Sequence, residues 1–290
     1  YLVRSRGLGD VYKRQDYRRF WTTTSLRGLI GATLKVEVLT EGVHSGGASG
    51  HVPSYFSMAR LLFSSIVNVK TGEILLDELK TEIPDYRLKE TEEFVSVLGD
   101  EVVEEFPWKE TMEPSSSDNV EGVLRRTWRP ALSVVGADGL PPSANAGNVL
   151  RPFTQLQLSM RIPPMVDPIK AQEAMRKALT ENPPYNAKVT LHFEEGASGW
   201  NAPETKPWLS KAMNKYSKIF FKEPSGSLCE GGTIPFMAML GEQFPKAQFV
   251  ITGVLGPGSN AHGPNEFLHI PYAKKLTACV ASILSDFRAD

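Results

Sequence analysis

The chain has 290 residues, of which 41% are hydrophobic, and a formal net charge of −1 at pH 7. This length suits one large domain or two moderate ones, with enough apolar residues for a buried core. The near-neutral charge excludes a bulk attraction to nucleic acid or anionic membranes, and no apolar run of 18 residues could span a bilayer.

The chain lacks an apolar leader segment, and its two cysteines, Cys229 and Cys279, are too few for a disulfide framework. We therefore expect reduced thiols and a cytoplasmic location. Residues 1–15, "YLVRSRGLGDVYKRQ", show no periodicity, and their tail resembles translated adapter sequence. We set them aside as an artefact, which predicts that upstream protein is missing; a disordered native tail is the alternative.

Residues 29–195 show alternating strand patterns and two amphipathic helices. Within the strand at 153–161, Leu156, Leu158 and Met160 are expected to point inward. A proline is expected in the first turn of the first helix, and Asp167 is expected to cap the second. The predicted order is a strand at 32–39, a helix at 52–68, strands at 131–138 and 153–161, a helix ending near 180, and a strand at 187–193.

This order is the split βαβ pattern of a ferredoxin-like domain, a four-stranded sheet with helices on one side. Residues 69–130 do not fit it and are interpreted as an insertion, with a charged helix at about 88–105 and a loop at 113–119. The chain around this domain is divided into a short piece at 16–28 and a longer one at 196–290.

The longer piece has the pattern of the end of an α/β domain. We expect helices at about 206–221 and 272–287, and a further helix opening at the glycines of "EGGTIPFMAMLGEQF". The apolar run "AQFVITGV", 247–254, predicts a strand buried on both faces.

A glycine-rich loop, "GPGSNAHGPNEFLHIPY", follows that predicted strand. Ligands of α/β domains collect at the carboxyl ends of strands, so His262 could ligate zinc, or it could be a surface histidine. His269 has apolar neighbours and is expected to be structural. Glu266 could orient a histidine or cap the last helix.

The segment "CEGGTIPF" contains groups that could bind an anion and groups that could bind an amine. Gly231 and Gly232 at a helix start leave backbone N–H groups to hold an anion, and Glu230 could pair with an amine. Such a site suits a zwitterion, although an ordinary turn and helix cap is the alternative. Elsewhere, His44 lies in a glycine-rich loop.

Arg161 ends a strand and could bind a carboxylate or an oxyanion, and Asn148 is a polar loop residue. Exposure without function is the alternative for Arg161, for Asn148 and for His44. His192 is expected on the outer face of its strand.

Five motifs occur in one order: "TEGVHSGGASG", "NAGNVLRP", "LQLSMRIPP", "CEGGTIPF" and "GPGSNAHGPNE". Together they resemble the aminoacylase and carnosine-dipeptidase family of dinuclear zinc peptidases, most of all its cytosolic nonspecific dipeptidase branch. The resemblance implies an α/β fold: the C-terminal part of a zinc-peptidase catalytic domain, with an inserted α+β ferredoxin-like lid that also forms a homodimer.

The resemblance also implies residue roles. His262 would be the last zinc ligand of a two-zinc site, with Mn²⁺ as an alternative metal. His44 would reach across the dimer to stabilise the oxyanion of the tetrahedral intermediate. The remaining residues would bind a small peptide: Arg161 and Asn148 would hold its carboxylate or the oxyanion, Glu230 its free amine, and Gly231, Gly232 and Thr233 the adjoining part.

The chain departs from the family pattern at its start. The HxD motif, the bridging aspartate, the Glu-Glu pair with the general base, and a further aspartate are not found, and Asp16 lies a few residues past the expected ligand. We therefore expect this chain alone to be inactive. An N-acyl-amino-acid deacylase or amidase is the second hypothesis, and a non-catalytic dimerisation or binding module is the third.

Overall fold

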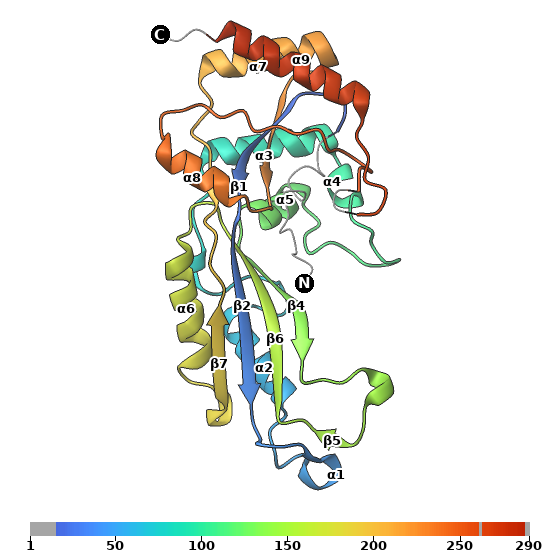
Figure 1. Ribbon diagram of the computed structural model, residues 1–290, viewed down its shortest axis with the longest axis vertical. Coiled ribbons are helices and arrows are strands. Elements are labelled where there is room, and N and C mark those ends of the chain that lie inside the picture. Colours follow the sequence, from blue (N-terminus) through green and yellow to red (C-terminus); the bar gives the residue numbers. More distant parts are fainter. Residues whose placement is uncertain (1–15, 261–262, 288–290) are drawn as a thin grey trace. The chain divides into compact units, whose positions relative to one another are not determined.

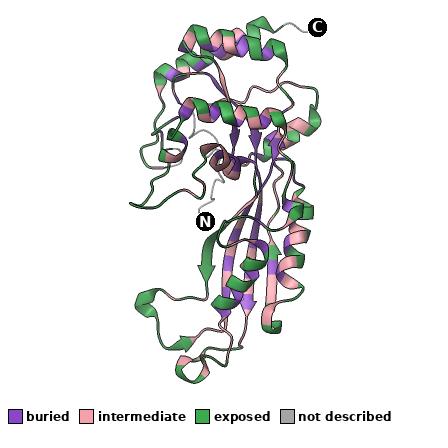
Figure 2. Cartoon of the chain, turned by 180° about the vertical axis from the view of Figure 1, so that it is seen from behind, coloured by how far each residue is buried: buried purple, intermediate pink, exposed green. Residues whose placement is uncertain are grey.

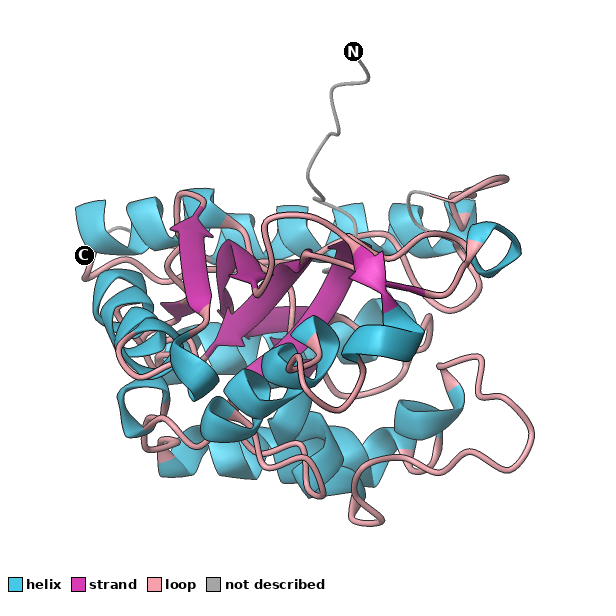
Figure 3. Cartoon of the chain, turned by 90° about the horizontal axis from the view of Figure 1, so that it is seen from below, coloured by secondary structure: helices cyan, strands magenta, loops and turns pink. Residues whose placement is uncertain are grey.

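The computed structural model describes residues 16–260 and 263–287. The chain contains both helices and strands (Figure 3). It divides into two compact units. Unit 1 consists of residues 1–27, 82–128 and 199–290, and unit 2 of residues 28–81 and 129–198. The segment predicted to be one insertion at 69–130 is therefore shared, because residues 82–128 belong to unit 1.

Unit 2 is built on a four-stranded antiparallel sheet in the order β4-β6-β2-β7 (Figure 1). This order, together with the helices α2 and α6, confirms the ferredoxin-like prediction. The strands and helices are β2 Gly28–Glu37, α2 Tyr55–Ile66, β4 Ala131–Asp138, β6 Phe153–Ile162, α6 Pro168–Thr180 and β7 Lys188–Phe193.

The alternation in the sequence becomes the core of unit 2. Leu34 of β2 is fully buried, and the inward side chains of β6, namely Leu156, Leu158 and Met160, are at most 5% exposed. These side chains pack against α2 and α6, so one face of the sheet is covered by helices. Figure 2 shows this as buried segments along the central strands.

The two helices begin at different signals. Asp167 caps α6, because its side chain accepts hydrogen bonds from the backbone N–H groups of Ile169 and Lys170, as predicted. The expectation for the first helix was wrong: Ser54 is its N-cap and Pro53 precedes it. The helix at 52–68 is therefore shorter than predicted.

Unit 2 also contains short elements at the end of the sheet where β2 finishes. They are β3 Val43–His44, α1 Ser45–Ala48, η3 Ser143–Asn145 and β5 Val149–Leu150. β3 pairs with β5 in an antiparallel manner, which joins loops about one hundred residues apart in sequence. The 3-10 helices η2 Asp77–Leu79 and η4 Pro184–Asn186 complete the unit.

Unit 1 has a smaller sheet in the order β8-β1-β9, formed by Trp200–Asn201, Trp21–Leu26 and Gly226–Glu230. β1 and β9 are parallel. The helices α7 Pro207–Phe221 and α9 Ile270–Asp286 pack together, and α8 Pro235–Gln243 follows β9. The predicted strand at 247–254 is wrong for the part of the chain that is described, since only Ile251 forms an isolated bridge, to Thr23.

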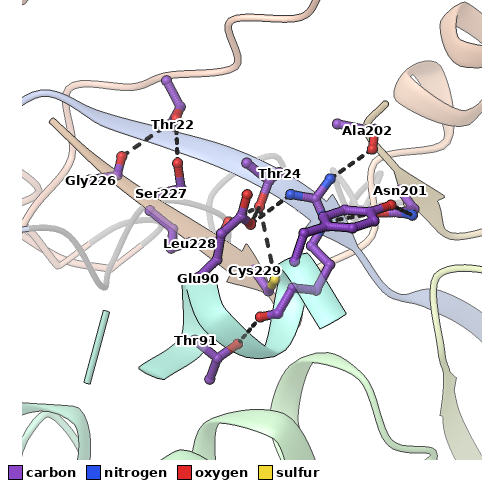
Figure 4. A network of polar contacts seen from close by, with 12 residues as sticks. Thr22, Thr24, Glu90, Thr91, Asn201, Ala202, Gly226, Ser227, Leu228 and Cys229 are labelled. Carbon is purple, nitrogen blue, oxygen red and sulfur yellow. Dashed lines mark hydrogen bonds and ion pairs between the residues drawn. The ribbon is translucent and has the colours of Figure 1, made fainter. Parts of the chain in front are cut away.

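The segment 82–128 is tied to the sheet of unit 1 by polar contacts. It forms α3 Asp85–Leu98, α4 Glu101–Glu104 and α5 Asn119–Thr127. Arg87 is 1% exposed and forms an ion pair with Glu90 at 2.6 Å, while its Nε donates to Asn201 of β8 at 2.9 Å. Thr24 of β1 donates to Glu90 at 2.8 Å (Figure 4). A charge this deeply buried requires partners, and α3 and the sheet supply them to each other.

Candidate functional site

The turn from β9 to α8 contains four of the predicted substrate-binding residues. Glu230 is the last residue of β9 and is 0% exposed, with no exposed surface on its two carboxylate oxygens. Gly231 and Gly232 follow, and α8 begins at Pro235 without a side-chain cap. The expectation that the helix opens at the glycines was therefore wrong, because Thr233 and Ile234 separate them from it.

Gly231 is required by a close approach of the backbone. A Cβ atom there would lie 2.3 Å from the carbonyl oxygen of Arg126 and 3.0 Å from Nη2 of Arg27. Because the first of these neighbours is backbone, it cannot move aside as a flexible side chain would. The turn is therefore packed tightly between Arg27 and the end of α5.

Arg27 holds the same turn by hydrogen bonds. Its Nε donates to the carbonyl of Gly231 at 3.2 Å, and its backbone N–H donates to the carbonyl of Glu230 at 3.3 Å. The hydroxyl of Thr233 donates to the carbonyl of Arg27 at 2.6 Å. Sequence reasoning missed Arg27, although it stands at the predicted boundary between the short piece at 16–28 and the ferredoxin-like domain.

His44 lies at the far end of unit 2, on β3. Its Nδ1 accepts a hydrogen bond from the backbone N–H of Gly46 at 3.2 Å. A neutral imidazole that accepts at Nδ1 carries its proton on Nε2, so the exposed side chain presents a hydrogen-bond donor. A Cβ atom on Gly46 would lie 2.9 Å from Cε1 of His44, which explains the glycine after the serine in this loop.

Asn148 lies beside His44. Its carbonyl accepts the N–H of Ser45 at 2.9 Å, and the next residue, Val149, is the register partner of His44. Two residues from separate sequence motifs are therefore brought to one loop cluster. Both are exposed.

Arg161 lies on the four-stranded sheet, at the end opposite to the one where β2 finishes and the chain leads to β3. It is the ninth of the ten residues of β6 and pairs with Leu29, at the start of β2, and with Ala131. A ten-residue strand extends about 30 Å. Unit 2 therefore separates Arg161 from His44 and Asn148, and one small substrate cannot touch both ends within a single copy of unit 2.

The predicted zinc ligand, His262, lies outside the described residues. The loop around it is closed by a backbone hydrogen bond from Phe267 to Ser259 at 3.1 Å. Asn260 has a positive φ of 53°, and its side chain donates to the carbonyl of Pro264 at 2.5 Å.

His269 is structural, as expected. It is the N-cap of α9, with Nδ1 accepting from the backbone N–H of Tyr272 at 3.0 Å. Its ring stacks on Tyr17 at a centroid distance of 4.3 Å. His192 is exposed on β7, as predicted. Glu266 is not the cap of α9, since His269 occupies that position.

The residues that the structure describes do not assemble a metal site by themselves. No group of three or more His, Cys, Asp or Glu side chains arranged to hold a metal occurs among residues 16–260 and 263–287. Asp16 is 4% exposed, but it is used locally: it accepts from Trp21 Nε1 at 2.9 Å and pairs with Arg18. The donor set present therefore does not fit a dinuclear centre.

The two cysteines are free and buried, as expected for reduced thiols. Burial raises the pKa of the Cys279 thiol to about 12. Burial also raises the pKa of Cys229, whose sulfur accepts from Trp128 Nε1 at 3.2 Å. Thiols held in their neutral form are poor nucleophiles, so neither is suited to cysteine-based hydrolysis.

Unit 1 has a cavity of about 260 Å³ near α3 and α4. Its lining includes the apolar side chains of Phe94, Leu98 and Val102 and the acidic side chains of Glu101 and Glu104. None of the predicted site residues that the structure describes lines it. The described helices are also too short or too polar to cross a membrane.

Comparison with known proteins shows what the chain is similar to. No family model matches the chain. A curated cysteinylglycine-S-conjugate dipeptidase of Corynebacterium striatum is 26% identical over 268 residues, which cover 87% of this chain and 55% of that protein. The chain is therefore similar in sequence to a dipeptidase over a little more than half of that protein's length.

Two solved structures are similar to the chain in fold. The dipeptidase Dug1p of Saccharomyces cerevisiae superimposes with a TM-score of 0.73 at 20% identity, over 97% of this chain and 58% of that one. Human carnosine dipeptidase 1 gives 0.70 at 16% identity, over 94% and 58%. The chain therefore spans little more than half the length of the relatives it matches.

Proposed function

We propose that the protein containing this chain hydrolyses dipeptides or short peptides that carry a free amino group, in a metal-dependent reaction. The observation that carries the proposal is the β9–α8 turn, in which the carboxylate of Glu230 directly precedes two glycines. A carboxylate beside backbone N–H groups suits a zwitterionic substrate. The C. striatum relative is itself named a dipeptidase.

In this proposal the turn binds one end of the peptide. Glu230 pairs with the amine, while Gly231, Gly232 and Thr233 form the adjoining cradle. Since the carboxylate oxygens of Glu230 have no exposed surface in this structure, amine binding requires the turn or its surroundings to open. Glu230→Gln should then raise KM for free-amine dipeptides and leave the free energy of unfolding little changed.

The proposed roles of unit 2 follow from its two separated ends. Arg161 holds the substrate carboxylate or the oxyanion of the site formed by its own protomer. His44 donates its Nε2–H to the oxyanion of the partner's site, and the contact between the motifs of His44 and Asn148 supports placing Asn148 there as well. This arrangement requires a homodimer.

The edge strand β4 supports a dimer formed through unit 2. It pairs only with β6 among the described strands, and Val134 and Val135 on it are 48% and 62% exposed. An apolar sheet edge is a surface that another strand can extend. A dimer of this kind would be lost or weakened by Val135→Lys, which analytical ultracentrifugation can measure.

We propose zinc as the metal, with Mn²⁺ as an alternative, and His262 as one ligand. The metal would supply Lewis-acid activation, while His44 and Arg161 carry charge stabilisation from the protein side. His262→Ala should lower the metal content of the protein. His44→Ala should cut turnover and leave metal content unchanged, so metal loss in that variant would contradict the role given to His44.

A cytoplasmic location forms part of the proposal, supported by the two free, buried cysteines.

The decisive assay compares Ala-Gly with N-acetyl amino acids on the full-length, metal-loaded protein. Faster hydrolysis of Ala-Gly is expected. Preference for N-acetyl substrates would support the deacylase alternative instead. Failure to hydrolyse either, without stoichiometric binding of zinc in a titration, would support a non-catalytic dimerisation or binding module.

A further inference from the structure

We infer that Arg27 is a positioning residue for substrate binding, acting through the backbone of the β9–α8 turn. The inference rests on the proposed function. Arg27 is only 8% exposed, and a guanidinium removed from water in this way must be offset by hydrogen-bond acceptors or negative charge. The carbonyl of Gly231, at 3.2 Å from its Nε, is one such acceptor.

The hydrogen bond to the carbonyl of Gly231 fixes the orientation of the whole peptide unit between Gly231 and Gly232. The peptide unit between Gly231 and Gly232 is planar and trans, so its carbonyl and its N–H point in opposite directions. Fixing the carbonyl of Gly231 therefore also fixes the direction of the N–H of Gly232. That N–H is one of the backbone donors proposed to meet the substrate.

Two glycines in succession make this restraint necessary. Glycine has the largest range of backbone conformations, so a Gly-Gly turn does not hold one orientation by itself. Arg126 limits Gly231 on one side through its carbonyl, and the guanidinium of Arg27 lies on another. Arg27 also binds both ends of the turn, through the carbonyl of Glu230 and the hydroxyl of Thr233.

The side-chain contact can be separated from the backbone contacts by mutation. Arg27→Ala keeps the backbone bonds to Glu230 and Thr233 and removes the side chain beyond Cβ, including the guanidinium. Arg27→Lys keeps a positive charge but loses the Nε–H. The control is Arg176→Ala, because Arg176 also donates a guanidinium N–H to a backbone carbonyl, that of Leu191, at the same 3.2 Å but in unit 2.

The first measurement is hydrogen exchange of the backbone amides of residues 231–234 in the chain, which does not depend on activity. Faster exchange is expected in Arg27→Ala and, to a smaller degree, in Arg27→Lys, with no change there in Arg176→Ala. The second is the steady-state kinetics of Ala-Gly hydrolysis by the full-length, metal-loaded protein. Loss of a hydrogen bond from a charged donor predicts a KM raised about tenfold in Arg27→Ala, with a smaller change in kcat.

Added guanidinium ion should lower the KM of Arg27→Ala, which a purely structural defect would not show. Unchanged exchange and unchanged KM in a folded Arg27→Ala or Arg27→Lys protein would overturn the inference, as would equal effects in Arg176→Ala. If the wild-type protein does not cleave Ala-Gly, the proposed function fails, and the exchange measurement still decides whether Arg27 orders the turn.

Discussion

The two units are stabilised in different ways. Unit 2 buries an apolar sheet face under two helices, with Leu34, Leu158 and Met160 nearly inaccessible. Unit 1 has a smaller sheet whose contact with α3 includes a buried arginine in a polar network. Apolar packing is non-directional and tolerates small shifts, whereas each member of a buried polar network must find its partner. Unit 1 should therefore be the more sensitive to the loss of a single group.

The largest effect is expected from Arg87→Ala. It removes a buried guanidinium that contacts Glu90, the side chain of Asn201 and the carbonyl of Ala202, which costs about 4 kcal/mol in the free energy of unfolding. Urea denaturation followed by circular dichroism would measure it. Arg125→Ala is the control, because Arg125 is a partly exposed arginine whose helical pair with Glu121 contributes about 0.5 kcal/mol.

In unit 2, Leu34→Ala should cost about 3 kcal/mol, the sum of lost apolar transfer and the cavity left in the core. Glu173→Ala, at an exposed position of α6, should change the free energy of unfolding by less than about 0.5 kcal/mol. A larger loss for Leu34→Ala than for Arg87→Ala would reverse the comparison between the units.

A smaller effect is expected at the start of α6. Asp167→Ala removes the acceptor for two backbone N–H groups and should cost about 1 kcal/mol. Asp167→Asn keeps a capping oxygen and should retain most of the stability. Equal losses in the two variants would show that the carboxylate charge, rather than the cap, is what matters.

The smallest effect expected is a pH dependence of stability that comes from Cys279 in unit 1. The pKa of Cys279 in the folded state is raised to about 12 from an ordinary value of 9.0, so its neutral thiol is favoured by folding. This contribution is complete below pH 9 and is lost as pH rises from 9 toward 12, when the unfolded chain ionises first. Cys279→Ala should reduce the fall in stability between pH 8 and pH 10, measured by urea denaturation; an unchanged fall would contradict the shift. Both cysteines lie in unit 1, so ionisation of a thiol should not lower the stability of unit 2.

The strands β2 and β6 of unit 2 were predictable because each has one buried face, which produces alternation. β1 gave no such pattern: "WTTTSL" is fully buried and rich in hydroxyl groups, and the Thr24 hydroxyl has two acceptors within reach of its one hydrogen, Glu90 and the carbonyl of Leu228. The run at 247–254 looked like a buried strand but is only partly buried and forms one bridge. Apolar composition alone does not supply a pairing partner.

The residues of the candidate site were easier to predict from the sequence than the contacts between them. His44 and Asn148 belong to motifs visible in the sequence, but their contact depends on the pairing of β3 with β5. Arg27 carried no local pattern, because its partner Gly231 is 204 positions away in sequence. Its importance arises only when two parts of unit 1 come together.

The central claim is that the two ends of unit 2 serve different sites of a dimer, and mixing two inactive variants tests it directly. His44→Ala and Arg161→Ala proteins would be prepared separately, then unfolded, mixed in equal amounts and refolded together with metal. If His44 acts on the partner's site, each mixed dimer has one intact site, and about a quarter of wild-type dipeptidase activity should return. No recovery in a mixture shown to contain mixed dimers would mean that His44 and Arg161 serve the same protomer's site, contrary to the account given above.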